Sequence, residues 1–293
     1  MTGGWDILHP RLYLGTSSWS SKDWDGVFYP TGISSDAYLA HYATRFRSVE
    51  VDATFYRIPS QSMVDRWRVT LPSGFRLAAK VPQTITHEKT LEGCADEMAR
   101  FVEVMARLED RLGPLLLQFP YYSKSSGWTL PRFLARLEAF LPCIPPDRPT
   151  ALEIRNKSWL VPDLLDLLRA RGIALALIDH PWMPPPEAFR ELPDLVTAPF
   201  CYVRWLGDRH GIESITRRWD KVIVDRTRQT AAWVPVIRTL LERGLTVHGY
   251  FNNHYAGHAP ASIALFERTW SAGVSGADDP APGAGGASPE ASA

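Results

Sequence analysis

The sequence has few cysteines, no net charge and no long apolar run. Its 293 residues include three cysteines, Cys94, Cys143 and Cys201, which are too few and too far apart to indicate a disulfide framework or a paired-thiolate metal site. The 32 basic and 32 acidic residues cancel, so the overall positive charge of many nucleic-acid-binding proteins is absent. No charged start precedes an apolar run, and no apolar run approaches about 18 residues. We therefore expect a cytoplasmic protein without a secretory signal or a membrane span.

What the sequence does contain is enough apolar material for a large core. Hydrophobic residues make up 45% of the chain and charged residues 22%, as expected for a globular protein. Residues 271–293 differ, because they are rich in Ala, Gly, Pro and Ser and cannot bury much surface. We predict one folded domain over residues 1–270 and a flexible tail over 271–293.

Short apolar or alternating segments recur along that domain, mostly separated by amphipathic stretches. The segments that predict strands are 11–17, 48–55, 75–81, 114–120, 150–155, 173–179, 200–206 and 246–253. Helices are predicted over 35–46, 62–71, 95–110, 131–141, 161–172, 226–244 and 259–270, whereas proline-rich 180–195 is not expected to be helical throughout. Eight strand–helix repeats predict a (β/α)8 barrel of TIM type. A doubly wound open sheet is the alternative, but no Gly-x-Gly-x-x-Gly motif follows the first strand.

Polar residues gather on one face and near the ends of these strands. Because side chains alternate along a strand, Glu50, Asp52 and Thr54 should all face the barrel interior. The other strands place further polar residues near their ends, where TIM-barrel enzymes keep their active sites: Lys80, Gln118, Glu153, Arg155, Asp179, Arg204 and Asn252. The three acidic and three basic residues here would balance in charge: Glu50, Asp52 and Glu153 against Lys80, Arg155 and Arg204. Buried ion pairs, however, add little net stability. We therefore favour a ligand or catalytic site over purely structural pairing, with Glu50, the deepest, as a structural anchor.

Seven segments spread along the chain form an ordered pattern. They are LGTSSWSSKDWDGVFYP (14–30), SVEVDATFYRIPS (48–60), GFRLAAKVPQTITHEKTL (74–91), LGPLLLQFP (112–120), LEIRNKSW (152–159), YVRWLG (202–207) and YFNNHYAGHAP (250–260). In this order they resemble the family called domain of unknown function 72, the YecE-like proteins, over residues 11–270. The resemblance implies a TIM-type barrel and no particular reaction.

The resemblance also points, by position, to a set of site residues. These are Gly15, Thr16, Ser18, Trp19, Glu50, Phe55, Tyr56, Lys80, His87, Gln118, Glu153, Arg155, Trp159, Arg204, Asn252 and Asn253. The chain departs from the family pattern at Asp52, where Asn is more usual, and over 120–128.

The polar residues predict an anion-binding site. Lys80, Arg155 and Arg204 together would hold a phosphate or carboxylate, because guanidinium groups offer paired donors and lysine adds a point charge. Glu153 would stay ionised between these cations and act as a base or orient Arg155, and His87 is a second acid–base candidate.

Other side chains would contact the uncharged part of a ligand. Gln118, Asn252 and Asn253 offer donors and acceptors to a polyol, an amide or a base edge. The loops after the first two strands carry aromatic residues that would either stack on a sugar or nucleobase or close the loops as an apolar cluster: Trp19, Trp24, Phe28, Tyr29, Phe55 and Tyr56.

Other kinds of site have weaker support. Glu153 and Asp179 on successive strands make a divalent metal an alternative, but three nearby cations would oppose it, and we expect no cofactor. His248, His254 and His258 are more typical of hydrogen-bonding residues than of metal ligands. A glycosidase pair of Glu50 and Glu153 is a minor alternative, because the two residues lie at different depths.

The leading hypothesis is a cofactor-independent enzyme of hydrolase, lyase or isomerase type. It would act on a small anionic, polar, sugar-like substrate, with Glu153, His87 and Lys80 as catalytic residues. A nucleic-acid or nucleotide binder using the basic and aromatic mouth is the alternative, and a non-catalytic metabolite-binding barrel is a third possibility.

Overall fold

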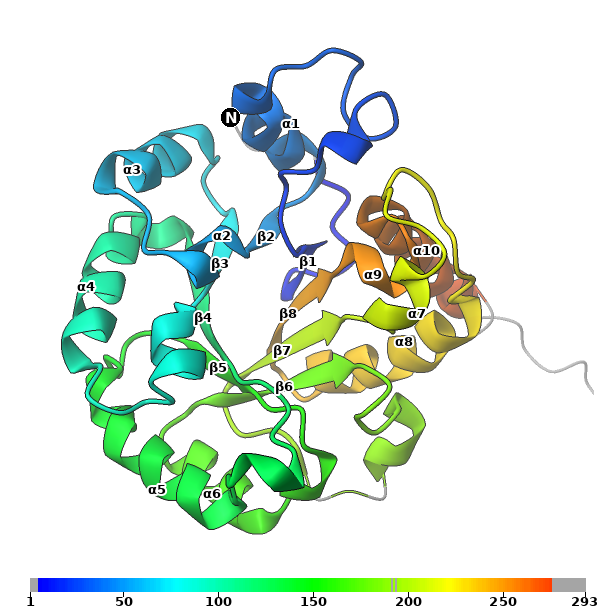
Figure 1. Cartoon of the computed structure of the whole chain (residues 1–293). Coiled ribbons are helices and arrows are strands. Elements are labelled where there is room, and N and C mark those ends of the chain that lie inside the picture. Colours follow the sequence, from blue (N-terminus) through cyan, green and yellow to red (C-terminus); the bar gives the residue numbers. More distant parts are fainter. Residues whose placement is uncertain (1–4, 191, 193, 276–293) are drawn as a thin grey trace, which may run out of the picture.

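Eight parallel strands form the centre of the molecule (Figure 1). The computed structural model describes residues 5–190, 192 and 194–275. The strands are β1 (Leu12–Thr16), β2 (Ser48–Val51), β3 (Arg76–Lys80), β4 (Leu112–Gln118), β5 (Thr150–Glu153), β6 (Ala174–Asp179), β7 (Phe200–Trp205) and β8 (Thr246–Phe251). They make one sheet in the order β1-β8-β7-β6-β5-β4-β3-β2, and each overlaps a predicted segment. The predicted TIM-type barrel is confirmed.

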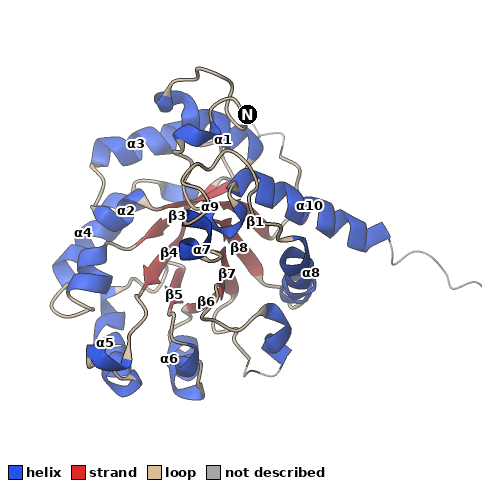
Figure 2. Cartoon of the chain, turned by 45° about the vertical axis from the view of Figure 1, so that its right-hand side comes forward, coloured by secondary structure: helices blue, strands red, loops and turns tan. Residues whose placement is uncertain are grey.

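Helices surround the strands on the outside (Figure 2). The longer ones are α1 (Tyr38–Arg45), α3 (Gln61–Thr70), α4 (Ala95–Ala106), α5 (Leu130–Phe140), α6 (Pro162–Ala170), α8 (Thr227–Glu242) and α10 (Ala259–Ser275), and the short ones are α2 (Ala53–Tyr56), α7 (Arg209–Glu213) and α9 (Asn253–Ala256). Gly172 and Gly244 follow α6 and α8 with φ of 61° and 87°, the left-handed backbone that glycine adopts most readily when a helix ends. Within the described residues of the proline-rich stretch 180–195, the regular element is a 3₁₀ helix, Pro186–Arg190. Among the described residues, no helix is both long and apolar enough to cross a membrane.

Two predicted boundaries differ from the structure. The second strand ends at Val51, four residues before the predicted end, and Ala53–Tyr56 form α2, so Asp52 and Thr54 do not continue the inward row of a strand. At the other end, α10 ends at Ser275, so it includes residues 271–275 of the predicted tail. The remainder of that predicted tail lies outside the described residues.

The barrel closes between β1 and β2 with the help of a side chain. An isolated bridge joins Ser17 to Glu50 there. The hydroxyl of Tyr42, from α1, accepts a hydrogen bond from Thr16 N at 2.8 Å and donates one to Ser48 O at 3.0 Å. The two strands come so close that a Cβ on Gly15 would lie 2.0 Å from Ser48 O. Glycine at position 15 is therefore required by the closure of the barrel.

The barrel interior is filled in layers of different polarity. Alanine, leucine and tyrosine side chains occupy the middle and are completely or nearly completely buried: Ala78, Leu116, Ala151, Ala176, Tyr202 and Tyr250. Above them, at the C-terminal ends of the strands, the inward residues are charged or polar. These include Glu50 and Arg204, which are 0% and 2% exposed. The fold therefore places the predicted polar cluster at the face where barrel enzymes keep their active sites.

Candidate functional site at the barrel mouth

Arg204 joins two carboxylates at the centre of the upper layer. Its Nη2 donates to Glu50 Oε1 at 2.6 Å and its Nη1 donates to Glu153 Oε2 at 2.5 Å. Both glutamates are 0% exposed. The strands β2, β5 and β7 that carry these residues are not neighbours in the sheet, so the pairing spans the barrel interior. Sequence reasoning placed Glu50 as an internal anchor, and the structure gives it that position.

Glu153 and Arg204 are held in their ionised forms. Burial tends to raise the pKa of Glu153, but the opposing effect of Arg204, Arg155 and Lys80 is larger and lowers the pKa to about 2. Burial tends to lower the pKa of Arg204, and its two carboxylate partners raise it well above its ordinary value. Glu153 is thus a carboxylate throughout the physiological range. A group with so low a pKa is a weak base, which makes it better suited to positioning cations than to accepting a proton.

Arg155 is the outermost cation of the chain of ion pairs. Its Nε donates to Glu153 Oε1 at 3.1 Å, so Glu153 holds one guanidinium with each oxygen. The Arg155 side chain is 27% exposed, in contrast to 3% for Arg204. Within the described part of the chain, the two Nη groups of Arg155 have no hydrogen-bond partner. They are therefore available to a ligand at the mouth.

Lys80 forms a second ion pair beside the first. Its Nζ lies 3.3 Å from Asp52 Oδ1 and 4.4 Å from the centre of the Phe55 ring. Thr54 fastens α2 to β3 by donating a hydrogen bond to Lys80 O at 2.8 Å. The early end of β2 thus turns Asp52 and Phe55 toward Lys80. An acidic residue at position 52, rather than the more usual amide, gives this lysine a counter-charge.

His87 lies in the π-helical turn Thr84–Glu88 that follows β3. Its ring contacts Phe55 edge-on at 4.9 Å between centroids, and its Nδ1 lies 2.9 Å from Thr86 Oγ1. Burial, Lys80 and Arg155 lower the pKa of His87 to about 4, although Glu153 acts in the opposite direction. The imidazole is therefore neutral at pH 7. In that form it can accept a proton, as a weaker base than an ordinary imidazole but a stronger one than Glu153, and it cannot act as a cationic acid at pH 7.

The predicted amide residues make contacts within the fold. Gln118 Nε2 donates to Phe119 O at 2.9 Å. The side-chain oxygen of Asn252 accepts from His254 N at 2.9 Å and caps α9, and that of Asn253 accepts from Ala259 N at 3.0 Å. All three side chains lie at or just beyond the ends of their strands, but these bonds tie each of them to nearby backbone.

The predicted aromatic and loop residues divide into buried and exposed ones. Trp159 is 7% exposed and stacks on Tyr122 at 5.4 Å between centroids, so it belongs to the apolar layer beneath α5. Trp19 is half-buried and meets Trp67 edge-on. Ser18, at φ 93°, donates its backbone N–H to Glu50 O at 2.8 Å. Tyr56, in contrast, is 71% exposed.

The loop after β1 contributes little aromatic surface to the mouth. Trp24 and Tyr29 are 1% and 2% exposed, and Phe28 packs on both of them. The sequence left two alternatives for these three residues. They form the apolar cluster that closes the loop.

Asp179 does not face the barrel interior, although it ends a strand. On β6 the inward side chains are Ala174, Ala176 and Ile178, so Asp179 points outward and accepts a hydrogen bond from Trp233 Nε1 of α8 at 2.8 Å. Asp179 and Glu153 therefore do not face one another in this structure. Among residues 5–275, apart from 191 and 193, there is no group of three or more His, Cys, Asp or Glu side chains that could hold a metal ion. His248 lies at the opposite end of the barrel, against Tyr13.

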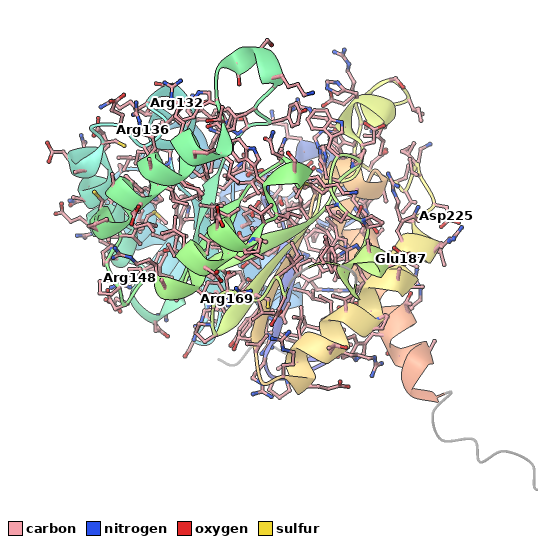
Figure 3. All side chains as sticks on the ribbon, turned by 90° about the horizontal axis from the view of Figure 1, so that it is seen from below. Arg132, Arg136, Arg148, Arg169, Glu187 and Asp225 are labelled. Atoms are coloured by element: carbon pink, nitrogen blue, oxygen red, sulfur yellow. The ribbon has the colours of Figure 1, made fainter. Side chains whose placement is uncertain are left out.

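Charged pairs elsewhere are of a different kind. Arg136, Arg148 and Arg169 lie on the outside of the molecule (Figure 3). Their carboxylate partners Glu92, Asp147 and Asp166 have side chains about 70% exposed. Exposed pairs contribute little to stability because water screens them. The buried group at the mouth is thus distinct from the ordinary surface pairing of this protein.

Sequence reasoning missed Tyr202, Tyr121 and Trp182. Tyr202 lies two residues before Arg204 and shares its inward face, so strand periodicity carried the signal for it. Tyr121 and Trp182 lie in the loops after β4 and β6 and are 49% and 50% exposed. Only the exposure of these two rings distinguishes them from core aromatics, and exposure is not visible in a single sequence.

Comparison with known proteins agrees with this architecture. The family model described as "Protein of unknown function DUF72" matches residues 13–284. The chain belongs to this family. Among solved structures, a DUF72 family protein from Thermotoga maritima MSB8 matches with a TM-score of 0.69 and 25% identity, over 89% of this chain and 99% of that one.

Curated DUF72 relatives carry names without an activity. The chain is 31% identical over 189 residues to the UPF0759 protein YecE of Escherichia coli (strain K12), which covers 61% of this chain and 65% of that protein. It is 28% identical over 182 residues to the UPF0759 protein YunF of Bacillus subtilis (strain 168), covering 58% of this chain and 61% of that protein. The alignments thus span less than two thirds of the length of these relatives.

Proposed function

We propose that this DUF72 protein is a cofactor-independent enzyme that acts on a small anionic, polar ligand at the C-terminal mouth of the barrel. Arg155 binds the anionic group, Lys80 adds a second positive charge, and His87 accepts a proton. Glu153 orients Arg155 and Arg204 and does not itself transfer a proton. The reaction class is acid–base chemistry of the hydrolase, lyase or isomerase type.

The position of Arg155 carries this proposal. A guanidinium binds a carboxylate or phosphate best through two parallel N–H donors. Arg155 is fixed through Nε by a fully buried carboxylate, while its side chain is 27% exposed and its Nη groups have no hydrogen-bond partner among the described residues. A cation held in this way is already oriented before the ligand arrives, which lowers the entropic cost of binding.

The balance of charge at the mouth favours directed recognition of the anion over attraction at long range. Glu50, Asp52 and Glu153 cancel Lys80, Arg155 and Arg204, so the six side chains carry no net charge. The chain as a whole also has none. A ligand must therefore gain its affinity from hydrogen bonds of good geometry. This favours a compact phosphate or carboxylate over an extended polyanion.

Metabolite turnover measured by mass spectrometry tests the proposal. The full chain and its Arg155→Ala and Arg155→Lys variants are each incubated with a small-molecule extract, and consumed and formed compounds are recorded. We expect the wild type to consume an anionic metabolite and Arg155→Ala to lose this activity. Arg155→Lys keeps the charge but lacks the paired donors, so it should retain only a small part. Equal turnover by all three proteins, or no turnover and no binding of any anion, would overturn the proposal.

If His87 is the base, its low pKa predicts how the reaction rate depends on pH. Its pKa of about 4 means that the proton-accepting form persists down to that pH. The rate should therefore stay level between about pH 5 and 8 if His87 is the base, and His87→Gln should be inactive at every pH.

Nucleic-acid or nucleotide binding is the second candidate, favoured by the exposed rings of Tyr56, Tyr121 and Trp182. It predicts oligonucleotide binding whose affinity falls steeply with salt concentration. Absence of such binding at low salt would reject it.

A further inference from the structure

Two exposed aromatic side chains meet just beyond the C-terminal ends of β4 and β6. Tyr121 follows β4 and Trp182 follows β6, and their ring centroids are 5.1 Å apart with the planes at 55°. They are 49% and 50% exposed, although each is large and apolar enough to be buried in a core. Rings that stay half in water at the C-terminal end of a barrel are typical of ligand-binding surfaces.

These two rings and three polar residues line an open cavity. The cavity has a volume of about 460 Å³ and is lined by Tyr121, Asn156, Lys157, Ser158 and Trp182. Asn156 is rigid, because its amide group both accepts from Tyr122 N and donates to Tyr122 O at 2.9 Å. Lys157 and Ser158 are exposed and offer donors and acceptors. The volume is in the range of small-molecule sites, roughly 300–1,000 Å³.

Arg155 lies next to the lining of this cavity in the chain. Asn156, Lys157 and Ser158 directly follow Arg155 in the chain. His180 provides a second connection, since its ring lies 5.0 Å from that of Trp182. Burial lowers the pKa of His180, and the positive charge of Arg155 lowers it further.

We propose that the cavity between Tyr121 and Trp182 is a subsite for the sugar part of a sugar phosphate or sugar acid, with the anionic group on Arg155. This inference rests on the proposed function and names its substrate class. The C–H face of a sugar packs on an aromatic ring, and its hydroxyl groups bind polar side chains such as Lys157 and Ser158. The 55° angle between the rings makes a corner, which suits a puckered sugar better than a flat base that needs a parallel slot.

Binding titrations with matched probes test the subsite. Inorganic phosphate, glucose 6-phosphate, gluconate, glucose and adenosine 5′-monophosphate are titrated by calorimetry into the wild type and into Trp182→Ala, Trp182→Phe, Tyr121→Ala and Arg155→Ala. Saturation-transfer NMR then identifies which ligand protons contact aromatic side chains. Thermal melts confirm that each variant is folded.

The expected pattern separates the two proposals. Glucose 6-phosphate or gluconate should bind more tightly than phosphate, and Trp182→Ala and Tyr121→Ala should weaken that binding about tenfold while leaving phosphate unaffected. Trp182→Phe should retain most of the affinity, because it keeps a ring. Arg155→Ala should weaken all anionic probes.

Other outcomes are equally informative. Loss of binding in Arg155→Ala with no effect of Trp182→Ala or Tyr121→Ala would overturn the subsite and leave the proposed function standing. Ring-dependent binding of adenosine 5′-monophosphate without binding of either sugar probe would overturn the sugar class in favour of a nucleobase. Lack of binding by every anionic probe would overturn both proposals.

Discussion

The hydroxyl of Tyr202 lies 2.6 Å from Glu50 Oε2 and donates a hydrogen bond to it in the buried upper part of the barrel. The other oxygen of the same carboxylate binds Arg204, which is two residues further along β7. One strand thus supplies both partners of a carboxylate on a distant strand. Both oxygens of the buried Glu50 carboxylate are thus hydrogen-bonded, as a buried polar group requires.

Removal of Arg204 should strongly destabilise the protein. Arg204→Met preserves most of the side-chain volume but leaves Glu50 and Glu153 as two buried carboxylates without their shared cation. We expect the free energy of unfolding to fall by about 3–5 kcal/mol. Urea unfolding of the wild type and the variant measures this difference.

Arg107→Gln is the matched control for that experiment. Arg107 also binds a carboxylate, through Asp65, but on the exposed surface. Removing this ion pair should change the midpoint of urea unfolding far less than Arg204→Met does, because water already solvates Arg107 and Asp65. Similar effects of the two substitutions would contradict the role assigned to the buried group.

Glu153 should make stability depend on pH in the acid range. Its folded pKa of about 2 lies below the ordinary value of 4.5, so its contribution is fully present above pH 4.5 and is lost as the pH falls toward 2. The total loss should be about 3 kcal/mol. Unfolding curves between pH 6 and 2 for the wild type and Glu153→Gln measure it, and the difference between the two proteins should shrink as the pH falls. Parallel curves would show that Glu153 has an ordinary pKa.

The closure between β1 and β2 should depend on one hydroxyl group. Tyr42→Phe keeps the ring but leaves Thr16 N and Ser48 O without their partner, and should cost about 1–3 kcal/mol. Tyr38→Phe is the control, because Tyr38 stacks on Tyr29 through its ring alone. Hydrogen exchange of the Thr16 amide should also accelerate in Tyr42→Phe. Equal stability of the two variants would exclude the hydroxyl bridge as a closing contact.

Asp179 should respond to pH in the direction opposite to Glu153. Burial raises its pKa, so the wild type loses stability as the pH rises through the ordinary value of 3.8 toward the folded one. Asp179→Asn removes this dependence and still offers an oxygen to Trp233 Nε1. The variant should therefore melt at the same temperature as the wild type or higher at pH 7, and its advantage should vanish near pH 3. A variant less stable than the wild type at pH 7 would show that the charge of Asp179 stabilises the fold.

Features that depend on neighbouring residues in the chain could be predicted from the sequence, whereas features that depend on contacts between distant strands could not. Alternation along β2 and β7 was sufficient to place Glu50 and Arg204 inside the barrel, because side-chain direction in a strand is a local property. For Asp179, which ends β6 as predicted, alternation gave no direction, because the preceding residues of that strand are all apolar and do not reveal its phase. Alternation also predicted a second strand that is longer than β2. The turn into α2 is held by the hydrogen bond from Thr54 to Lys80 O on β3, and such a contact between strands is not visible in the local pattern.

The sequence by itself determined the eightfold strand–helix pattern, the composition of the mouth and the family resemblance, because each depends on the order of residues along the chain. Only the tertiary structure decided which charges pair, that Arg204 is used internally while Arg155 faces the mouth, and that Tyr121 and Trp182 meet. The physical reason is that pairing and burial depend on distances between strands that are far apart in the sequence. Those distances are set when the barrel closes.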